Sequence, residues 1–304
     1  MRIKILMILS LILLGCSSKK EEQPKQFIYP KIELVANVNN SVAGDAVAVS
    51  FKTDTSIKDL KLQVKNAYGN VVLSPEHSEN ELMVFKIPKN FTRIAGPCRW
   101  KLILKGHTLR YGKFDIATNA YKATYVESYF GPRSVTAGYN DYSMLTISPT
   151  DAYDNPLDNG TEVTVKHQFQ ENIDELKITT ESFFAFYNVR STLQSGRILV
   201  SSECNGTNSK ELATIVYPSN ATDFSISSSS AHNFADGNQI ITFTSDIIRD
   251  EFGNTVTNGT LVTFVIKNVN DSYLYTIGTT INGIAEAKTL HPDKASKWEI
   301  QAFV

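Results

Sequence analysis

The sequence predicts an all-β protein made of tandem β-sandwiches, and two observations carry this prediction. Apolar and polar side chains alternate with a period of two along much of the chain, for example in residues 60–65, 162–166 and 298–304. Strands of this kind are buried on one face only, which is typical of antiparallel sheets packed into sandwiches. The apolar runs are also short and end at Gly, Asn, Asp or Pro, which favours strands joined by turns over helices.

Residues 1–15 are predicted to be a signal peptide. Arg2 and Lys4 precede an apolar run from 5 to 14, which is shorter than the roughly 20 residues needed to span a bilayer. The ending Leu-Leu-Gly-Cys at 13–16 resembles the lipobox of bacterial lipoproteins, and this resemblance implies that Cys16 carries a lipid anchor. An ordinary cleaved signal peptide that contains a cysteine is the alternative.

Residues 16–28 are predicted to be the lipidated Cys16 and a flexible tether, because "SSKKEEQPKQ" has almost no apolar side chain to bury. Ser17 is not the aspartate associated with inner-membrane retention, and "KEE" at 20–22 resembles the signal that sends lipoproteins of the Bacteroidota to the outer leaflet. These resemblances imply an outer-membrane, lipid-anchored protein, with the cell surface favoured over the periplasmic face. A solvated linker explains the three charges as well.

The composition limits the possible partners. Of 304 residues, 42% are hydrophobic, enough for the cores of two or three domains, and the net charge of −1 offers no bulk basicity for nucleic acid. Besides Cys16, the chain has Cys98 and Cys204, whose separation does not fit a disulfide within one small domain. Two separate buried thiols are favoured, and a bridge between domains is the alternative.

A repeated turn motif indicates the domain organisation. Residues 151–164 and 250–263 share Asp, Asn, Asn-Gly-Thr and Val-Thr at the same places, at an offset of 99 (250 − 151), and a fainter copy lies at 66–70. Asp and Asn side chains cap backbone amides, while Asn and Gly accept positive φ, so the motif predicts a strand reversal. We therefore expect three modules of sandwich size, at 29–119, 120–218 and 219–304.

The third module carries a longer pattern of Gly, Asn, Asp and alternating apolar residues. Its residues are Ala235-Asp236-Gly237, Asp250, Gly253-Asn254, Val256, Val262-Thr263-Phe264, Gly283, Ala285, Ala287, Leu290 and Ala302. This pattern resembles the bacterial Ig-like domain of the invasin and intimin adhesins, and the resemblance implies Ig-like sandwiches throughout the mature chain. The second module keeps the turn of this pattern, and the first retains only a generic likeness.

The second module departs from this pattern after its turn. Between Gly160 and Gly196 it has 36 residues where the third module has 24 between Gly259 and Gly283. We therefore expect an insertion around residues 172–188, with a brief helix-like or long-loop character. Aromatic residues concentrate there. They are Phe183, Phe184, Phe186 and Tyr187.

The aromatic cluster is the candidate binding site. Phe183 and Phe184 are adjacent, so strict alternation in a strand leaves at least one ring outside the core. An exposed aromatic patch would mark a binding surface. Alternatively, the insertion folds back and buries its own rings.

No sequence pattern predicts catalysis or a cofactor. The five histidines are scattered, and no HExxH, Cys-x-x-Cys, phosphate loop or Gly-x-Ser-x-Gly pattern occurs. Calcium is the inorganic candidate, because four oxygen-bearing side chains fall in one turn, namely Asp151, Asp154, Asn155 and Asp158. The later copy of the turn keeps only the first carboxylate and the Asn at these places, which favours a turn without metal.

The predicted function is non-catalytic. The adhesin resemblance implies an outer-membrane lipoprotein that displays Ig-like domains for adhesion or for binding another protein, on the cell surface or on a host. The alternative is a structural accessory subunit of an envelope complex for outer-membrane assembly, secretion or conjugation. Protease digestion of intact cells would separate surface display from a periplasmic location.

Overall fold

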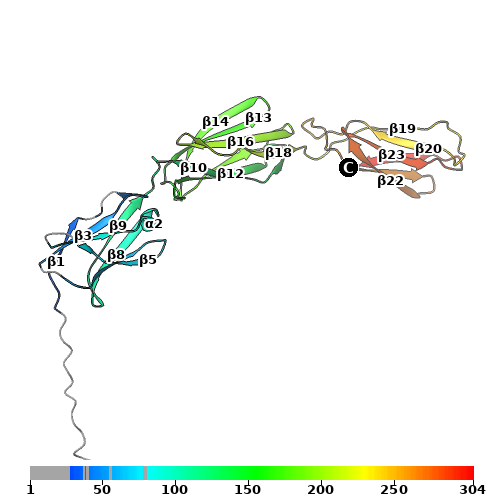
Figure 1. Cartoon of the computed structure of the whole chain (residues 1–304). Coiled ribbons are helices and arrows are strands. Elements are labelled where there is room, and N and C mark those ends of the chain that lie inside the picture. Colours follow the sequence, from blue (N-terminus) through cyan, green and yellow to red (C-terminus); the bar gives the residue numbers. More distant parts are fainter. Residues whose placement is uncertain (1–27, 37, 39–40, 55–56, 78–80) are drawn as a thin grey trace, which may run out of the picture. The chain divides into compact units, whose positions relative to one another are not determined.

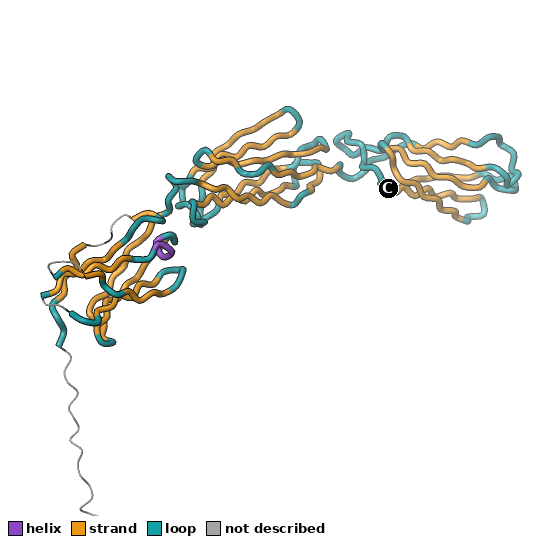
Figure 2. Tube along the Cα trace, in the orientation of Figure 1, coloured by secondary structure: helices purple, strands orange, loops and turns teal. Residues whose placement is uncertain are grey.

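The computed structural model describes residues 28–36, 38, 41–54, 57–77 and 81–304. The predicted signal peptide, Cys16 and the tether up to residue 27 lie outside these ranges. Strands dominate the described chain, and the one helix drawn there, α2 (Lys89–Thr92), has four residues (Figure 1, Figure 2). Within the described residues, no helix has the length and apolar character needed to cross a membrane. The predicted all-β class is confirmed.

The chain forms two compact units. The first contains residues 46–88 and 98–114 with the described residues up to 38, and the second contains residues 40–45, 89–97 and 115–304. Within the second unit, one cluster of buried apolar residues lies between 130 and 216 and another between 243 and 287. The predicted boundary at 218/219 falls between these clusters, and the division of the whole chain into three modules stays a prediction.

The first unit has an aromatic core between two sheets. Phe51 contacts Phe85 and Trp100 edge to face, with ring centroids 5.9 and 5.4 Å apart. The sheets have the orders β1-β3-β7-β6 and β2-β9-β8-β4-β5, of which β2, the first two residues of β8 and the end of β9 belong to the second unit. The strands are β1 (Ile32–Ala36), β2 (Ser41–Val42), β3 (Ala48–Thr53), β4 (Leu60–Lys65), β5 (Asn70–Leu73), β6 (Glu76–His77), β7 (Leu82–Lys86), β8 (Gly96–Leu104) and β9 (His107–Ala117).

We call the elements β10 to β18 the second sandwich. Its sheets have the orders β10-β12-β15 and β11-β18-β16-β13-β14, with β17 beside β16. Val163 and Val165 of β13 are buried while Glu162 and Lys166 are exposed, which is the alternation that the sequence predicts. The strands are β10 (Thr124–Gly131), β11 (Ser134–Thr136), β12 (Tyr142–Asp151), β13 (Glu162–Phe169), β14 (Asn172–Thr179), β15 (Ala185–Arg190), β16 (Gly196–Cys204), β17 (Thr207–Asn208) and β18 (Leu212–Tyr217).

The elements β19 to β24 form the third sandwich. They follow the order β19-β20-β23-β22-β21-β24, because β22 pairs with β21 along most of its length and with β23 at its end. Gly278 allows this change of partner, since a Cβ there would lie 2.2 Å from the backbone oxygen of Glu286. The strands are β19 (Ile226–Ser229), β20 (Ile240–Ser245), β21 (Leu261–Asn268), β22 (Tyr273–Ile281), β23 (Ile284–Leu290) and β24 (Trp298–Phe303).

The prediction of an insertion around residues 172–188 is wrong. β14 pairs with β13 along its whole length, and β15 pairs with β12, so this stretch holds two regular strands and no helix. In the third sandwich, β22 and β23 pair with β21 and β20 in the same way. Phe183 therefore takes the place of Gly283. The sequence comparison erred because it matched Gly283 to Gly196, which begins β16.

Candidate functional site

The four aromatic residues predicted as a binding cluster lie on β15 and on the turn before it. Phe183, Phe184 and Phe186 are exposed, and 62% of Phe186 is open to solvent. Tyr187 is half-buried and packs against the core of the second sandwich. The structure thus brings three of the four rings to the surface, and their role in binding stays a prediction.

Phe183 occupies a turn position that usually requires glycine. It forms a two-residue hairpin loop with Ser182, with φ of 79° and 51° respectively. In the matching loop of the third sandwich, Asn282 and Gly283 have φ of 52° and 81°. Asn-Gly is common in such loops because both residues have positive φ. This left-handed conformation costs a residue with a Cβ about 1–2 kcal/mol, so the chain keeps a bulky ring here against the local backbone preference.

Phe184 and Phe186 belong to a larger exposed surface. β15 pairs with β12, and β12 pairs with β10, so the outward side chains of the three strands form rows. One row runs from Tyr129 through Thr146 to Phe186, and Met144 lies in the next row. We call this surface the aromatic face. Its large exposed apolar residues are Tyr125, Tyr129, Tyr142, Met144, Phe184 and Phe186.

The aromatic face carries little charge. Among the outward residues of β10, β12 and β15, only Glu127 and Arg190 have charged side chains. The Tyr129 ring lies against Gly131, where an added Cβ would come within 3.0 Å of the hydroxyl. Large exposed apolar side chains gathered on one face of a soluble protein mark interaction sites. Tyrosine suits such a site, because its ring buries apolar area while its hydroxyl keeps a polar partner.

Four of the six residues of this face, Tyr125, Tyr129, Tyr142 and Met144, were missed from the sequence. Tyr125, Glu127 and Tyr129 of "TYVESYFG" share the exposed side of β10, while Thr124 and Phe130 are buried. The period of two therefore contains the signal that both tyrosines face outward. That they join the rings of β15 follows only from the pairing of both strands with β12, which no local pattern records.

Tyr187 supports the face from the inner side. Its ring stacks on His167, with centroids 5.9 Å apart and planes 9° apart. Burial lowers the pKa of His167, and the opposing attraction of Asp174 is too weak to restore it. The imidazole is therefore neutral at pH 7, as suits a ring packed on a ring. Tyr187 belongs to the scaffold of the site.

The candidate calcium turn is filled by its own hydrogen bonds. Asp151 is fully buried, and its Oδ1 accepts the N–H groups of Tyr153 and Asn155 at 2.8 and 3.1 Å. Asn155 Nδ2 donates to both oxygens of the same carboxylate. Asp154 has a φ of 63°, and the backbone oxygen of Asp158 accepts threonine hydroxyls. The described residues contain no group of three or more His, Cys, Asp or Glu that could hold a metal ion, and calcium binding stays a prediction.

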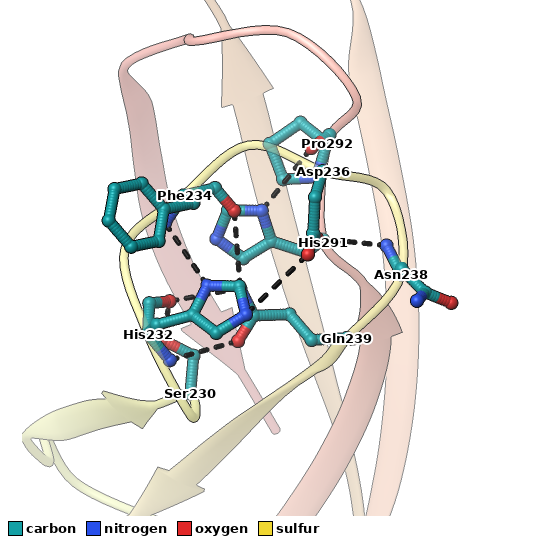
Figure 3. A network of polar contacts seen from close by, with 8 residues as sticks. All are labelled: Ser230, His232, Phe234, Asp236, Asn238, Gln239, His291 and Pro292. Atoms are coloured by element: carbon teal, nitrogen blue, oxygen red, sulfur yellow. Dashed lines mark hydrogen bonds and ion pairs between the residues drawn. The ribbon is translucent and has the colours of Figure 1, made fainter.

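The two histidines of the third sandwich lie at a polar loop between β19 and β20 (Figure 3). Gln239 Nε2 lies 2.8 Å from His232 Nδ1 and donates to the backbone oxygens of His232 and Phe234 at 3.0 and 3.2 Å. His232 Nε2 lies 3.5 Å from the Asp236 carboxylate. The backbone N–H of His291 donates to the backbone oxygen of Gln239 at 2.8 Å. Both ring nitrogens of His232 are engaged, so this histidine holds the loop together.

Solved structures with a similar fold include two bacterial adhesins. One is invasin, described as a bacterial integrin-binding protein, with a TM-score of 0.54 and 13% identity over 90% of this chain. The other is FdeC, a broadly conserved adhesin of Escherichia coli, with a TM-score of 0.53 and 14% identity over 93% of this chain. The alignments cover 57% of the invasin structure and 94% of the FdeC structure.

At these identities the likeness shows the fold alone. It confirms the invasin-type Ig-like architecture that the sequence resemblance implies. No family model matches the sequence, and no curated protein matches it either. The fold alone does not define the function of the chain, which depends on the chemistry of its own surface.

Proposed function

We propose that this chain is a non-catalytic outer-membrane lipoprotein that displays Ig-like sandwiches to bind another protein or to support adhesion. The aromatic face of the second sandwich carries the proposal. It gathers six large exposed apolar side chains on three adjacent strands and on the turn before β15. Solved bacterial adhesins use the same fold, which supports a role in display.

The chemistry of the face favours a protein as its partner. Aromatic residues and Met are enriched where protein interfaces are buried, and charged residues are depleted there. The aromatic face has this composition, with its two charged side chains on β10 and β15. The left-handed Phe183 beside it keeps an exposed ring at a backbone conformation that favours glycine. Strain of this kind clusters at functional sites.

The binding role is tested by cross-linking in cells that express the full chain. A Tyr129→Ser and Phe186→Ser double variant removes two rings of one row. Partner proteins are identified by mass spectrometry after purification. We expect at least one protein to be captured by the native chain and reduced about tenfold or more by the double variant, as for the loss of interface anchors.

The matched control is Tyr121→Ser, which removes a tyrosine that is 98% exposed and lies outside the aromatic face. This variant should capture the same partner as the native chain. Circular dichroism checks that all variants are folded. Equal capture by the native chain and the folded double variant would contradict the binding role of the face.

The lipid anchor and the location rest on residues 1–28 alone. A Cys16→Ser variant should lose its sedimentation with membranes, because several acyl chains on one residue are needed for stable anchoring. Sedimentation of this variant with membranes would contradict the lipoprotein assignment.

Protease added to intact cells decides the orientation. Digestion of the chain supports surface display. Protection until the outer membrane is opened supports the accessory subunit of an envelope complex instead.

A further inference from the structure

The repeated turn does more than reverse a strand. In its third-sandwich copy, Asp250 Oδ1 accepts the N–H groups of Phe252 and Asn254 at 2.9 and 2.8 Å, as turn chemistry predicts. Its other oxygen, Oδ2, accepts the N–H group of Ser219 at 2.8 Å. Ser219 lies in the linker between β18 and β19. One carboxylate thus fixes both the turn and the linker that enters the third sandwich.

Asn254 extends the same turn to the second sandwich. Its Nδ2 donates to the backbone oxygen of Leu193 at 2.8 Å, and its Oδ1 accepts the N–H group of Ser195 at 2.8 Å. Both partners lie in the loop between β15 and β16. A carboxamide is suited to this role because it donates and accepts at once. The strand reversal itself requires neither contact.

The aromatic residue of the turn makes the third contact. Phe252 packs against the core cluster of the second sandwich, although it belongs to the sequence of the third. Its ring faces Gly138, where an added Cβ would come within 3.2 Å of the ring. The turn therefore places an apolar ring and one hydrogen-bonding side chain on the second sandwich, and a second hydrogen-bonding side chain on the linker.

The earlier copy of the turn makes the same polar contacts within the second unit. Asn155 Nδ2 donates to the backbone oxygen of Arg93 at 2.7 Å, and Asn155 Oδ1 accepts the N–H group of Ala95 at 2.9 Å. Asp151 Oδ2 accepts the N–H group of Asn119 at 3.0 Å. Each of these partners stands about 100 residues before its counterpart in the later copy.

The aromatic contact is repeated as well. Tyr153 takes the place of Phe252 and lies against Gly44, where an added Cβ would come within 2.4 Å of the hydroxyl. The two glycines are held alike, because Gly44 N–H donates to the backbone oxygen of Thr92 and Gly138 N–H to that of Thr192, at 2.9 and 3.0 Å. The surface on which the turn docks, Gly44 with Thr92 and Gly138 with Thr192, is thus repeated together with the turn.

The geometry points to the Asp–aromatic–Asn turn as a joint that docks each sandwich on the protein segment before it. We propose that this joint restrains the motion of the third sandwich relative to the second. Domains in one chain move freely by default unless their interface is substantial. Here Asp250 and Asn254 are buried, so their hydrogen bonds to the linker and to the second sandwich are shielded from water.

The protonation state of Asp250 agrees with this role. Burial alone would raise the pKa of its carboxyl group, but hydrogen bonds from Asn254, Ser219 and Phe252 outweigh burial and hold the pKa below its ordinary value. The carboxylate is therefore ionised at neutral pH, and it accepts the hydrogen bonds from the turn and from Ser219 of the linker. Its stabilising effect is present above the unfolded-state pKa near 3.8 and is lost as the pH falls through the lower folded-state pKa.

Distance measurements between spin labels test the joint in the full chain carrying Cys16→Ser. Labels are attached after Lys210→Cys in the second sandwich and Lys288→Cys in the third, both exposed, while Cys98 and Cys204 are buried. Asn254→Ala and Phe252→Ala each remove one contact of the joint. We expect a narrow distance distribution in the native joint and a roughly twofold broadening in each variant.

Phe303→Ala, which removes an exposed ring of the third sandwich, is the matched control and should leave the distribution narrow. Thermal denaturation checks the fold of each variant. If Asn254→Ala unfolds the third sandwich, Phe252→Ala decides, because its ring packs on the second sandwich. A narrow distribution in folded Phe252→Ala, or equal broadening in Phe303→Ala, would overturn the proposal.

Discussion

The second and third sandwiches share a fold but differ in the chemistry of their outer faces. On the outer face of β13 and β14, the second sandwich carries two ion pairs, Lys166 with Glu175 at 3.3 Å and Lys177 with Glu162 at 2.7 Å. The third sandwich has apolar residues at all four matching positions of β21 and β22. These are Val265, Tyr275, Ile277 and Leu261.

The opposite sheets show the reverse difference. On β15 the second sandwich exposes Phe186 and Asn188, whereas the matching residues of β23 are the charged Glu286 and Lys288. Each sandwich therefore has one apolar face, and the two faces lie on different sheets. Buried positions and turns hold the fold in both copies, while the outward positions vary without disturbing it.

The largest expected effect comes from the hairpin loop of the third sandwich. Gly283→Ala should destabilise that sandwich by about 3 kcal/mol, because it adds backbone strain and crowding together. The new Cβ would come within 2.4 Å of Thr255 Cγ2 at a φ of 81°. Chemical denaturation measures the loss. A change below about 1 kcal/mol would contradict the steric explanation.

The matching loop of the second sandwich should respond in the opposite direction. Phe183→Gly relieves the left-handed strain, so we expect a gain of about 0.5–1 kcal/mol in the free energy of unfolding. Partner capture should fall in the same variant, because a ring at the rim of the aromatic face is lost. Phe183→Asn, which tolerates positive φ, serves as the control. Lower stability in both variants would show that the Phe183 ring is structural.

Introducing an ion pair of the second sandwich into the third sandwich should have a small effect on stability. Val265→Lys with Tyr275→Glu transfers an ion pair of the second sandwich to the third. We expect the free energy of unfolding to change by about 0.5 kcal/mol or less, because both positions face outward and exposed ion pairs contribute little. Thermal and chemical denaturation test this. A large loss would mean that these side chains are packed in the folded protein.

The smallest expected effect is a pH dependence in the second sandwich. The folded-state pKa of His167 lies below the ordinary value of 6.5. The unfolded chain therefore binds the proton more readily, and stability should decrease as the pH falls from 6.5 toward the folded-state pKa. Denaturation at pH 7.5 and at pH values below 6.5 measures this decrease. His167→Gln removes the titrating group and should remove this part of the pH dependence.

Local patterns predicted the all-β class and the turn because both depend on neighbouring residues. The alternation in β13 and the capping by Asp151 and Asp250 appear in the structure as expected. The positive φ expected at the turn is found at Asp154 and Gly253. These features need only the period of a strand and the chemistry of Asp, Asn and Gly.

The remaining features depend on contacts that the sequence order hides. The insertion was inferred because Gly196 looked like the partner of Gly283, whereas the true partner is Phe183, a residue type rare at positive φ. Similarly, the aromatic face joins β10 to β15 through β12. Asn254 bonds residues about 60 positions earlier, and no turn rule predicts this reach.

The two ends of the third sandwich carry different halves of the joint. Gly237, in the loop between β19 and β20, donates its N–H to the backbone oxygen of Pro292 at 3.1 Å, as Gly44 and Gly138 do with Thr92 and Thr192. This glycine contact lies just before the start of β20, whereas the Asp250 turn follows the end of β20. The third sandwich thus has the docking turn at one end and, at the other end, a glycine contact like those on which the turns dock. Head-to-tail contacts of this kind are heterologous, because the two partners contribute different surfaces. A gene could lengthen such a protein by duplicating one sandwich, because the new copy would bring both halves of its own joint.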